Sequence, residues 1–301
     1  VIDNREAISF DHIESVTVDG PDSSSMLAIT VMGTGDDDQF TAVGQGAAAV
    51  DVQVNNGLIV SYVDIASLLL QGKSGDDDFD VDVNDLTTVA IAIDGGDPNT
   101  NGDTVTVTGE GGAMADNANY TPTGADGGIL AIAGLDNTGP GNQITLQNIE
   151  RLIYDGEDEN ETLTVTGSAS DNTIVHLPGS TNDAGTIRVD QWLAIEYVNV
   201  GTTGSVAING AGQTGTDRLV VEGTPAADVF GVAGVTTVTL NNRVSISTTN
   251  IEAYTLNGQA GDDTFNLTAV ADVPITVAGD ASGNDKLNFT STGATTVELG
   301  S

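Results

Sequence analysis

A spaced motif recurs from one end of this 301-residue chain to the other, and it limits the possible folds more than any other feature. The motif is Gly-x-x-Gly-x-Asp, followed two residues after the acid by an apolar side chain. Its clearest copies are residues 72–79, 212–219 and 258–265. Looser copies keep the first glycine, an acid and the apolar residue, at 33–40, 156–163 and 223–230. A turn that recurs in this way predicts a repeated architecture.

Between these turns, apolar and polar residues alternate. The stretches 104–108 and 90–93 have the two-residue period of a half-buried strand, and Gly, Asn or Asp interrupts such stretches after about ten residues. Only residues 64–71 have a pattern that a helical turn would also satisfy, and the matching segment around Tyr254 favours a strand there too. The sequence therefore predicts an all-β protein.

Two all-β arrangements fit these signals. A right-handed parallel β-solenoid (β-helix) of imperfect repeats would stack equivalent strands and place the Gly/Asp turns along one edge. A tandem array of small β-sandwich domains would use Asn55-Asn56-Gly57 as a hairpin turn. Aromatic residues are only 4% of the chain, which suits narrow aliphatic stacks. We favour the solenoid and keep the sandwich array as the alternative.

We interpret residues 1–301 as a single continuous repeat region. Three pieces recur along it: an Ile-Glu pair, as at 149–150; a strand that ends in Gly-Thr or Gly-Ser, as at 33–34; and an Asn-Asn pair, as at 55–56. Joining them predicts the end of a preceding unit at 1–22, imperfect units at 23–102, 103–160, 161–216 and 217–284, and the start of a next unit at 285–301. The stretch 109–148 departs most from the pattern and is predicted to be a loop-rich insertion.

The charge of the chain excludes several partners. There are 44 Asp and Glu against 7 Lys and Arg, a formal net charge of -37. Nucleic acid and anionic membrane surfaces need clustered basic residues, which are absent. No apolar run approaches the ~18 residues that a membrane-spanning helix requires, so we expect no membrane insertion. The chain has no cysteine, which excludes disulfides and thiolate metal sites. This charge attracts cations instead.

The turn motif resembles the haemolysin-type calcium-binding (RTX-like) nonapeptide, Gly-Gly-x-Gly-x-Asp-x-Φ-x, in which Φ is apolar. Residues 72–80, 212–220 and 258–266 match it except at the second glycine. The wider pattern is similar to the repeat regions of very large bacterial extracellular and surface proteins. That resemblance implies secretion, a calcium-supported solenoid and a role on or beyond the cell surface. The family's nonapeptides run consecutively, whereas here strands separate the copies, and Ser25 and Asn172 replace the acid in degraded ones.

Calcium accepts six to eight oxygen ligands in flexible geometry, and aspartate supplies a hard anionic oxygen. We therefore predict calcium at the intact motifs. The predicted ligands are Asp38, Asp77, Asp217 and Asp263, with Asp36, Asp76, Asp262 and Asp285 assisting. The competing interpretation is that these carboxylates accept hydrogen bonds from turn amides without any metal, as in Asx-turns.

Little in the sequence indicates catalysis. His12 and His176 are the only histidines and are too far apart in sequence to read as a pair. His176 lies in an apolar strand and is predicted to be a face residue rather than a base. Trp192 could stack on a sugar, although packing at an edge is favoured. No phosphate loop, His-Glu-x-x-His or nucleophile elbow is present, and we predict that the protein is not an enzyme.

Together these features predict an extracellular structural or adhesive repeat protein, a calcium-stiffened stalk or filament segment on a secreted bacterial protein. Val1 starts inside the repeat pattern, and 295–299 reads as a strand, so neither end shows a polar cap. Each end is therefore expected to meet neighbouring repeats or another copy of the protein. The alternative is a carbohydrate-binding or polysaccharide-degrading β-helix module, with glycans bound near 109–148 and Trp192.

Overall fold

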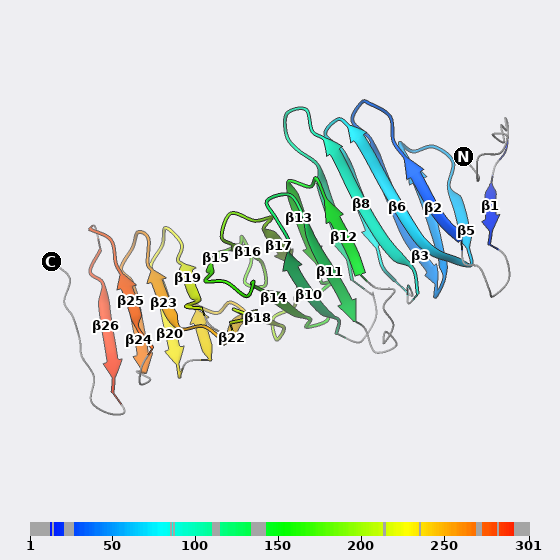
Figure 1. The fold of residues 1–301 in the computed structure, drawn as a ribbon. Coiled ribbons are helices and arrows are strands. Elements are labelled where there is room, and N and C mark those ends of the chain that lie inside the picture. Colours follow the sequence, from blue (N-terminus) through cyan, green and yellow to red (C-terminus); the bar gives the residue numbers. More distant parts are fainter. Residues whose placement is uncertain are drawn as a thin grey trace.

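The strands of this protein form two long sheets. A computed structural model shows the strands of each sheet following one another along a single axis (Figure 1). The structure describes residues 13, 15–20, 27–84, 86, 88–109, 115–133, 143–212, 215–234, 236–268, 273–281 and 283–291. These ranges contain strands and turns but no helix, and therefore no helix that could cross a bilayer. Val1, His12, Ser25 and residues 295–299 lie outside them.

Each sheet has thirteen strands. Sheet A contains, in spatial order, β1 (Val16–Asp19), β5 (Val60–Val63), β4 (Ala49–Val54), β3 (Gln39–Gly46), β7 (Asp78–Asp82), β9 (Thr104–Thr108), β13 (Arg151–Asp155), β17 (Ile195–Val198), β16 (Gly185–Val189), β15 (Thr173–Pro178), β19 (Arg218–Glu222), β23 (Ala253–Asn257) and β25 (Ile275–Ala278). Sheet B contains β2 (Leu27–Met32), β6 (Ile65–Ser74), β8 (Ala90–Asp97), β12 (Gln143–Gln147), β11 (Gly128–Ala133), β10 (Asn117–Pro122), β14 (Thr162–Thr166), β18 (Ser205–Asn209), β22 (Ser245–Thr249), β21 (Thr237–Leu240), β20 (Val229–Ala233), β24 (Thr264–Thr268) and β26 (Lys286–Thr290).

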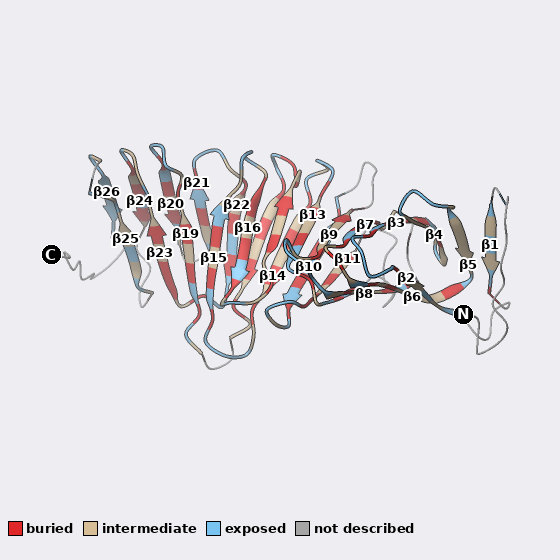
Figure 2. Ribbon diagram, turned by 90° about the horizontal axis from the view of Figure 1, so that it is seen from above, coloured by how far each residue is buried: buried red, intermediate tan, exposed pale blue. Residues whose placement is uncertain are grey.

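The two sheets share one core. Burial alternates along the strands, as in Thr162–Thr166, where Leu163 and Val165 are fully buried between intermediate threonines. The inward side chains of both sheets join a single aliphatic cluster, which also holds two stacked ring pairs, Phe40 with Phe79 and Phe230 with Phe265. Figure 2 shows this burial as a band that runs along the stack while the sheets twist. The predicted all-β class is confirmed, and Ile65–Ser74 is a strand.

The sheets are mixed rather than purely parallel, which the sequence did not predict. The chain passes between the sheets, but at four places it stays in one sheet for three antiparallel strands before crossing over. These meanders are β3–β5 and β15–β17 in sheet A, and β10–β12 and β20–β22 in sheet B. Strands that belong to different passes pair in parallel. One meander falls within each of the four predicted units, in alternate sheets.

Two sequence expectations change with this topology. The Asn55-Asn56-Gly57 turn does form a hairpin, with φ of 54° at both asparagines, but the hairpin joins β4 to β5 inside a continuous sheet. It therefore does not mark a separate small sandwich. The stretch 109–148, predicted to be loop-rich, contains β10, β11 and β12 and is a regular meander within its described part. Buried positions such as Ala118 and Tyr120 alternate with exposed ones in this stretch, but its high content of Gly, Ala and Asn makes the alternation hard to recognise in the sequence.

Candidate functional site: buried carboxylates at the strand starts

The acidic residue of several repeated turns lies immediately before a strand, and its side chain reaches the equivalent residue of the preceding strand. Asp77 Oδ1 accepts a hydrogen bond from the backbone amide of Asp38 at 2.7 Å, and Asp103 Oδ1 accepts one from Asp77 at 2.7 Å. Glu150 Oε2 continues the series at the amide of Asp103, again at 2.7 Å. We call this series of side-chain-to-backbone bonds the amide ladder. It follows the starts of β3, β7, β9 and β13, which are neighbours in sheet A.

Two more ladders repeat the arrangement. The first, at the starts of β15, β19 and β23, links the amide of Asn172 to Asp217 and the amide of Asp217 to Glu252, at 2.7 and 2.8 Å. The second lies in sheet B at the starts of β20, β24 and β26. There the amide of Asp228 donates to Asp263 at 2.8 Å, and the amide of Asp263 donates to Asp285 at 3.0 Å.

Backbone hydrogen bonds link the same turns in the opposite direction. The carbonyl oxygen of Asp38 accepts the amide of Asp78, and that of Asp77 accepts the amide of Thr104, both at 2.9 Å. Each turn is thus tied to the next by a backbone carbonyl and to the previous one by a side chain. Regular backbone hydrogen bonding between the strands has not yet begun at these positions. The carboxylate therefore supplies the backbone amide with an acceptor that the sheet itself does not.

A different set of partners holds the first residue of each ladder, which has an antiparallel strand on its other side. Asp38 accepts the backbone amide and hydroxyl of Thr34 in its own turn, and the amide side chain of Asn55 after the second meander strand. Asp228 repeats this with Thr224 and Asn241. These contacts account for the recurrent Gly-Thr and Asn-Asn pieces of the sequence.

Asn172 lacks the acid of an intact copy of the motif, but its side-chain partner has changed to match. The Nδ2 amide of Asn172 donates to Asp190 Oδ2 at 2.8 Å, and its side-chain oxygen Oδ1 accepts the backbone amide of Ser168 at 2.7 Å. Asp190 lies where Asn55 and Asn241 lie in the other meanders and accepts the amide of Thr173, as they accept those of Gln39 and Val229. One carboxylate and one amide are therefore kept, with their positions exchanged.

The first glycine of the motif makes room for the carboxylate. A Cβ placed on Gly72 would lie 2.1 Å from Asp77 Oδ2 and 2.5 Å from the carbonyl oxygen of Gly95. At Gly258 the same atom would lie 2.1 Å from Asp263 Oδ2. Both distances are far below van der Waals contact, so the glycine is required for space rather than for a special backbone angle. Gly35, by contrast, has nothing within 4 Å of such a Cβ.

The second oxygen of several ladder carboxylates is buried without a hydrogen-bond partner. This holds for Oδ2 of Asp77, Asp103, Asp217 and Asp263. Burial raises the pKa of Asp77 and of Asp103 to about 6; the hydrogen bond from the ladder amide opposes this rise in pKa, and neighbouring carboxylates add to it. Burial likewise raises the pKa of Glu161, at the start of β14, to about 7. The ladders therefore favour neutralisation, by a proton or by a cation.

The outer carboxylates behave differently. Asp76 accepts the backbone amides of residues 99–102 with distances of 2.8 to 3.4 Å, and these bonds lower its pKa. Asp262 accepts the amide of Asn284 at 2.9 Å. Asp36 is exposed, and its own amide is bonded to the Thr34 hydroxyl at 3.2 Å. Asp285 is exposed at the last described ladder step.

The predicted metal residues are thus brought into columns, not into a cage. Among the described residues, no three Asp, Glu or His side chains converge on a point that could hold a metal ion. Asp77, Asp103, Asp217 and Asp263 each offer one unpaired carboxylate oxygen, so any bound calcium would need backbone carbonyl ligands as well. The structure does show the amide contacts of the competing interpretation. Calcium itself remains a prediction.

Sequence reasoning missed several ladder residues although their signals were present. Glu150 and Glu252 belong to the recurrent Ile-Glu pairs, and their carboxylates accept from the turns before them. Asn241 and Asp190 close the first positions of their ladders. A pattern of recurrence marked the glutamates and Asn241, but only the fold shows that they meet the motif aspartates.

The residues considered for catalysis or sugar binding lie elsewhere. His176 is buried in the core, where its Nε2 and the Tyr197 hydroxyl are 2.8 Å apart, and burial lowers its pKa to about 4. It faces inward rather than lying on an outer face. Trp192 packs half-buried against the core. Arg151 pairs with Glu196 across β13 and β17 at 2.8 Å, an exposed contact worth little to stability.

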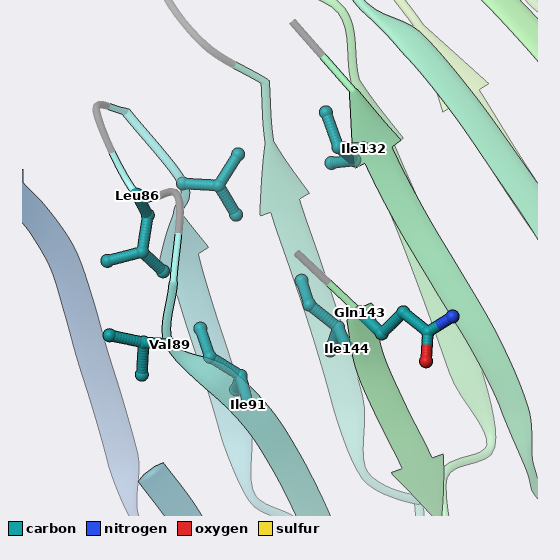
Figure 3. Close-up of a pocket in the computed structure, with 7 residues that line it drawn as sticks. Leu86, Val89, Ile91, Ile132, Gln143 and Ile144 are labelled. Carbon is teal, nitrogen blue, oxygen red and sulfur yellow. The ribbon is translucent and has the colours of Figure 1, made fainter. Parts of the chain in front are cut away.

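A small pocket between sheet B and the connection from β7 to β8 offers no chemistry. It is lined by Val83, Leu86, Val89, Ile91, Ile132, Gln143 and Ile144. Figure 3 shows the aliphatic side chains around the gap, and Gln143 pointing away from Leu86 and Val89. None of these residues titrates, so the pocket is a packing gap rather than a reaction centre.

Comparison with known proteins adds no further identification. No protein-family model matches the chain, and neither does any curated protein sequence. The resemblance to calcium-binding repeats therefore rests on the motif residues alone.

We expect Asp77→Ala to destabilise the fold by about 1–3 kcal/mol, because the buried amide of Asp38 would lose its acceptor. Asp77→Asn keeps an acceptor oxygen for that amide and should cost markedly less. Chemical denaturation of both variants measures the difference. Equal losses for Ala and Asn would contradict the role assigned to the ladder bond.

Gly72→Ala should destabilise by about 1–3 kcal/mol or more, because the added methyl group would overlap the Asp77 carboxylate and a backbone carbonyl. Gly35→Ala is the matched control in a neighbouring turn, and it should be neutral or slightly stabilising. Thermal melting of the two variants distinguishes them. A Gly72→Ala protein as stable as Gly35→Ala would show that the carboxylate does not occupy this space.

Acidification should stabilise the protein in EDTA. The pKa values of Asp77, Asp103 and Glu161 are raised in the folded state to about 6, 6 and 7, so the folded protein binds protons that the unfolded chain, with pKa near 4, does not. This contribution is complete below about pH 4 and is lost as the pH rises through about 6–7. The melting temperature should therefore rise between about pH 7.5 and pH 5, and less so in Asp77→Asn. A fall over this range would show that the ladders prefer charged carboxylates.

Proposed function

We propose that this chain is a structural segment of an extracellular or cell-surface protein, a right-handed two-sheeted β-solenoid that stacks end to end with further strands of the same kind. The continuous pair of sheets and the repeated ladders support a scaffold role, because chemistry that recurs at every turn suits architecture better than catalysis. The extracellular location rests on the resemblance of the motif to bacterial surface repeats.

The exposed end of the stack at β26 supports the proposed end-to-end association. Leu287 pairs with Phe265 in register, and Phe289 pairs with Leu267. The partners on β24 are core residues, 1% and 5% exposed, whereas Leu287 and Phe289 are 47% and 38% exposed. These two side chains continue the core stack, and a further strand would bury them as β26 buries their neighbours.

The other end has a similar character. Leu27, Ile29 and Val31 on β2 point toward the core, yet they remain only half-buried, whereas Leu68 and Leu70 on the next strand of sheet B are fully buried. Both ends of the described stack therefore expose aliphatic positions that continue the core. The occupant we propose is another turn of the same fold, from a neighbouring repeat or from a second copy.

Calcium is the counter-charge that we propose for the ladders. The buried, unpaired oxygens of Asp77, Asp103, Asp217 and Asp263 support a cation, because adjacent buried carboxylates repel one another. When bound, calcium would supply positive charge to these oxygens and so tie successive turns together. With or without calcium, the carboxylates hold successive turns together through their hydrogen bonds with backbone amides.

Sedimentation velocity in calcium and in EDTA tests the proposal. We expect concentration-dependent association of the 301-residue protein, lost in Leu287→Lys/Phe289→Lys because charged side chains cannot be buried at the joint. Asn288→Lys is the matched control, since Asn288 lies between these residues on the outward side of β26 and should leave association intact. A strictly monomeric wild-type protein at high concentration would refute end-to-end stacking.

The same samples report on calcium through thermal melting. Binding to the folded state alone stabilises by about 2.7 kcal/mol when calcium is at 100 times its Kd. A calcium-specific rise in melting temperature, smaller in Asp77→Asn, is the expected result. An equal response to magnesium, or none, would leave the ladders as purely proton-linked structure and remove calcium from the proposal.

A further inference from the structure

The turn from β13 to β14, residues 156–161, lies away from the amide ladder. β9 and β13 pair in parallel and in register from Arg151 to Asp155. The amide ladder crosses the starts of these strands, where Glu150 accepts the amide of Asp103. The turn follows their ends, after a five-residue strand that spans roughly 13 Å. Whatever this turn binds is therefore separate from the amide ladder.

This turn is strongly acidic. Four of its six residues are Glu or Asp. Burial raises the pKa of Glu157 and of Glu161, and the charged groups that raise it further are other carboxylates, among them Asp116 at the start of β10. Like charges at close range repel, so the turn favours a neutralising partner. Acidity alone does not identify that partner, because exposed carboxylates are solvated.

Buried oxygen atoms beside the turn point more directly to a ligand. Glu161 Oε2, Glu159 Oε2 and the hydroxyl oxygen of Tyr154 are buried and have no hydrogen-bond partner among the described residues. Glu161 is 1% exposed and Tyr154 is 0% exposed. Burial raises the pKa of Tyr154, and the charges of Asp116 and Glu161 raise it further, which places the hydroxyl near both. Unsatisfied buried oxygens are costly, so a ligand that contacts them would be stabilising.

A ladder does not account for these oxygens. Ser205, the first residue of β18, donates its amide to the carbonyl oxygen of Glu161 at 2.9 Å. The residue before it, Gly204, therefore lies where the next ladder carboxylate would stand, and it has no side chain. The Glu161 carboxylate instead interacts with the backbone amides of Glu159 and of Glu161 itself, which opposes the rise in its pKa that burial causes. It is thus directed into its own turn rather than along the stack.

The donor atoms of the turn suit a hard cation. A Cβ on Gly156 would lie 2.9 Å from the carbonyl oxygen of Asn199 and 3.0 Å from Glu161 Oε2, so a carbonyl and a carboxylate oxygen face the same side of this glycine. Calcium accepts carboxylate and carbonyl oxygens in flexible geometry, whereas magnesium demands near-ideal octahedral geometry and keeps several waters. The burial of Glu161 and Tyr154 therefore favours calcium over magnesium.

We propose that the turn 156–161 binds one calcium ion beside Tyr154, with Glu159 and Glu161 as its carboxylate ligands and carbonyl oxygens such as that of Asn199 completing the shell. Only two carboxylates take part, which agrees with the lack of any three-acid cluster in the described part of the chain. The site does not depend on calcium binding in the ladders. Because β13 belongs to sheet A and β14 to sheet B, the ion would hold the crossover between the sheets.

The ion would also stabilise an unusual backbone. Glu157, Asp158 and Asn160 have φ of 58°, 72° and 74°, in the left-handed region that is costly for residues other than glycine. Three such residues in one turn persist only where the surroundings hold them. Contacts from two of the turn's side chains to one cation would supply part of that restraint.

Terbium luminescence excited through tyrosine tests this site, because Tb³⁺ replaces calcium at oxygen sites and emits strongly only near an excited aromatic ring. The metal-free wild-type protein should give saturable emission, which excess calcium removes and the same concentration of magnesium does not. Tyr154→Phe should remove most of this emission. Tyr254→Phe is the matched control and should retain it, since Tyr254 follows Ala253, whose amide donates to the carbonyl oxygen of Asp217 in another ladder.

Acid-to-amide variants test the ligands. Glu161→Gln should raise the half-saturating terbium concentration by roughly tenfold or more, because one charged ligand becomes neutral while the side-chain shape is kept. Asp77→Asn makes the same change in the amide ladder and should leave the emission unchanged, whatever it does to melting in calcium. Melting temperatures show whether each variant is folded. If Glu161→Gln does not fold, Glu159→Gln replaces it, because Glu159 is less buried.

Several results would overturn the proposal. They are no sensitised emission, emission that survives Tyr154→Phe, and half-saturation that is unchanged in the glutamine variant. Emission lost equally in Tyr254→Phe or Asp77→Asn would place the metal in the ladders and overturn it as well. Equal displacement by magnesium would overturn the assignment to calcium. The emission reports on the turn and the melting of Asp77→Asn reports on the amide ladder, so the failure of one proposal is distinguishable from that of the other.

Discussion

The amide ladder is the interaction on which the rest of this structure depends. At the starts of β3, β7, β9, β15, β19, β20 and β24 a backbone amide points along the stack before regular sheet pairing begins, and a carboxylate from the next turn accepts it. Leaving such a buried amide without an acceptor is costly, so one acid per turn is a structural requirement. The glycine five residues before Asp77, and its counterpart before Asp263, follow from the same requirement, since no Cβ fits beside the carboxylate.

That solution creates an electrostatic problem of its own. Repeating a carboxylate at successive turns places negative charge inside the protein, and burial, together with the neighbouring carboxylates, raises the pKa of Asp77 and Asp103. At one ladder start the buried negative charge is reduced. Asn172 carries an amide in place of an acid at one ladder start, and the acid moves to Asp190, nearer the surface.

Much of this architecture was predictable because it depends on local pattern. The period-two alternation fixed the strands, and the recurrent turn indicated stacking. The meanders were not predictable, because an antiparallel return within a sheet and a parallel crossover use the same alternating residues, and only pairing partners far apart in sequence decide between them. Asn55-Asn56-Gly57 shows the difficulty: its hairpin is real, yet it is compatible with either fold. For the site, the motif identified Asp38, Asp77, Asp217 and Asp263 as special, but not their contacts with Glu252 or Asn241, which require the register of neighbouring strands.

The backward course of the meanders has a mechanical consequence. In a simple stack each turn touches only the turns before and after it, so turns can fray singly from an end. Here the first strand of a meander runs ahead to pair with a later strand, as Phe40 does with Phe79, while its last strand returns to pair with an earlier one, as Val60 does with Val16. Detaching one strand of such a block removes the support of the other two. Under tension the protein would therefore yield in whole three-stranded blocks, and its extension would occur in a few large steps rather than many small ones.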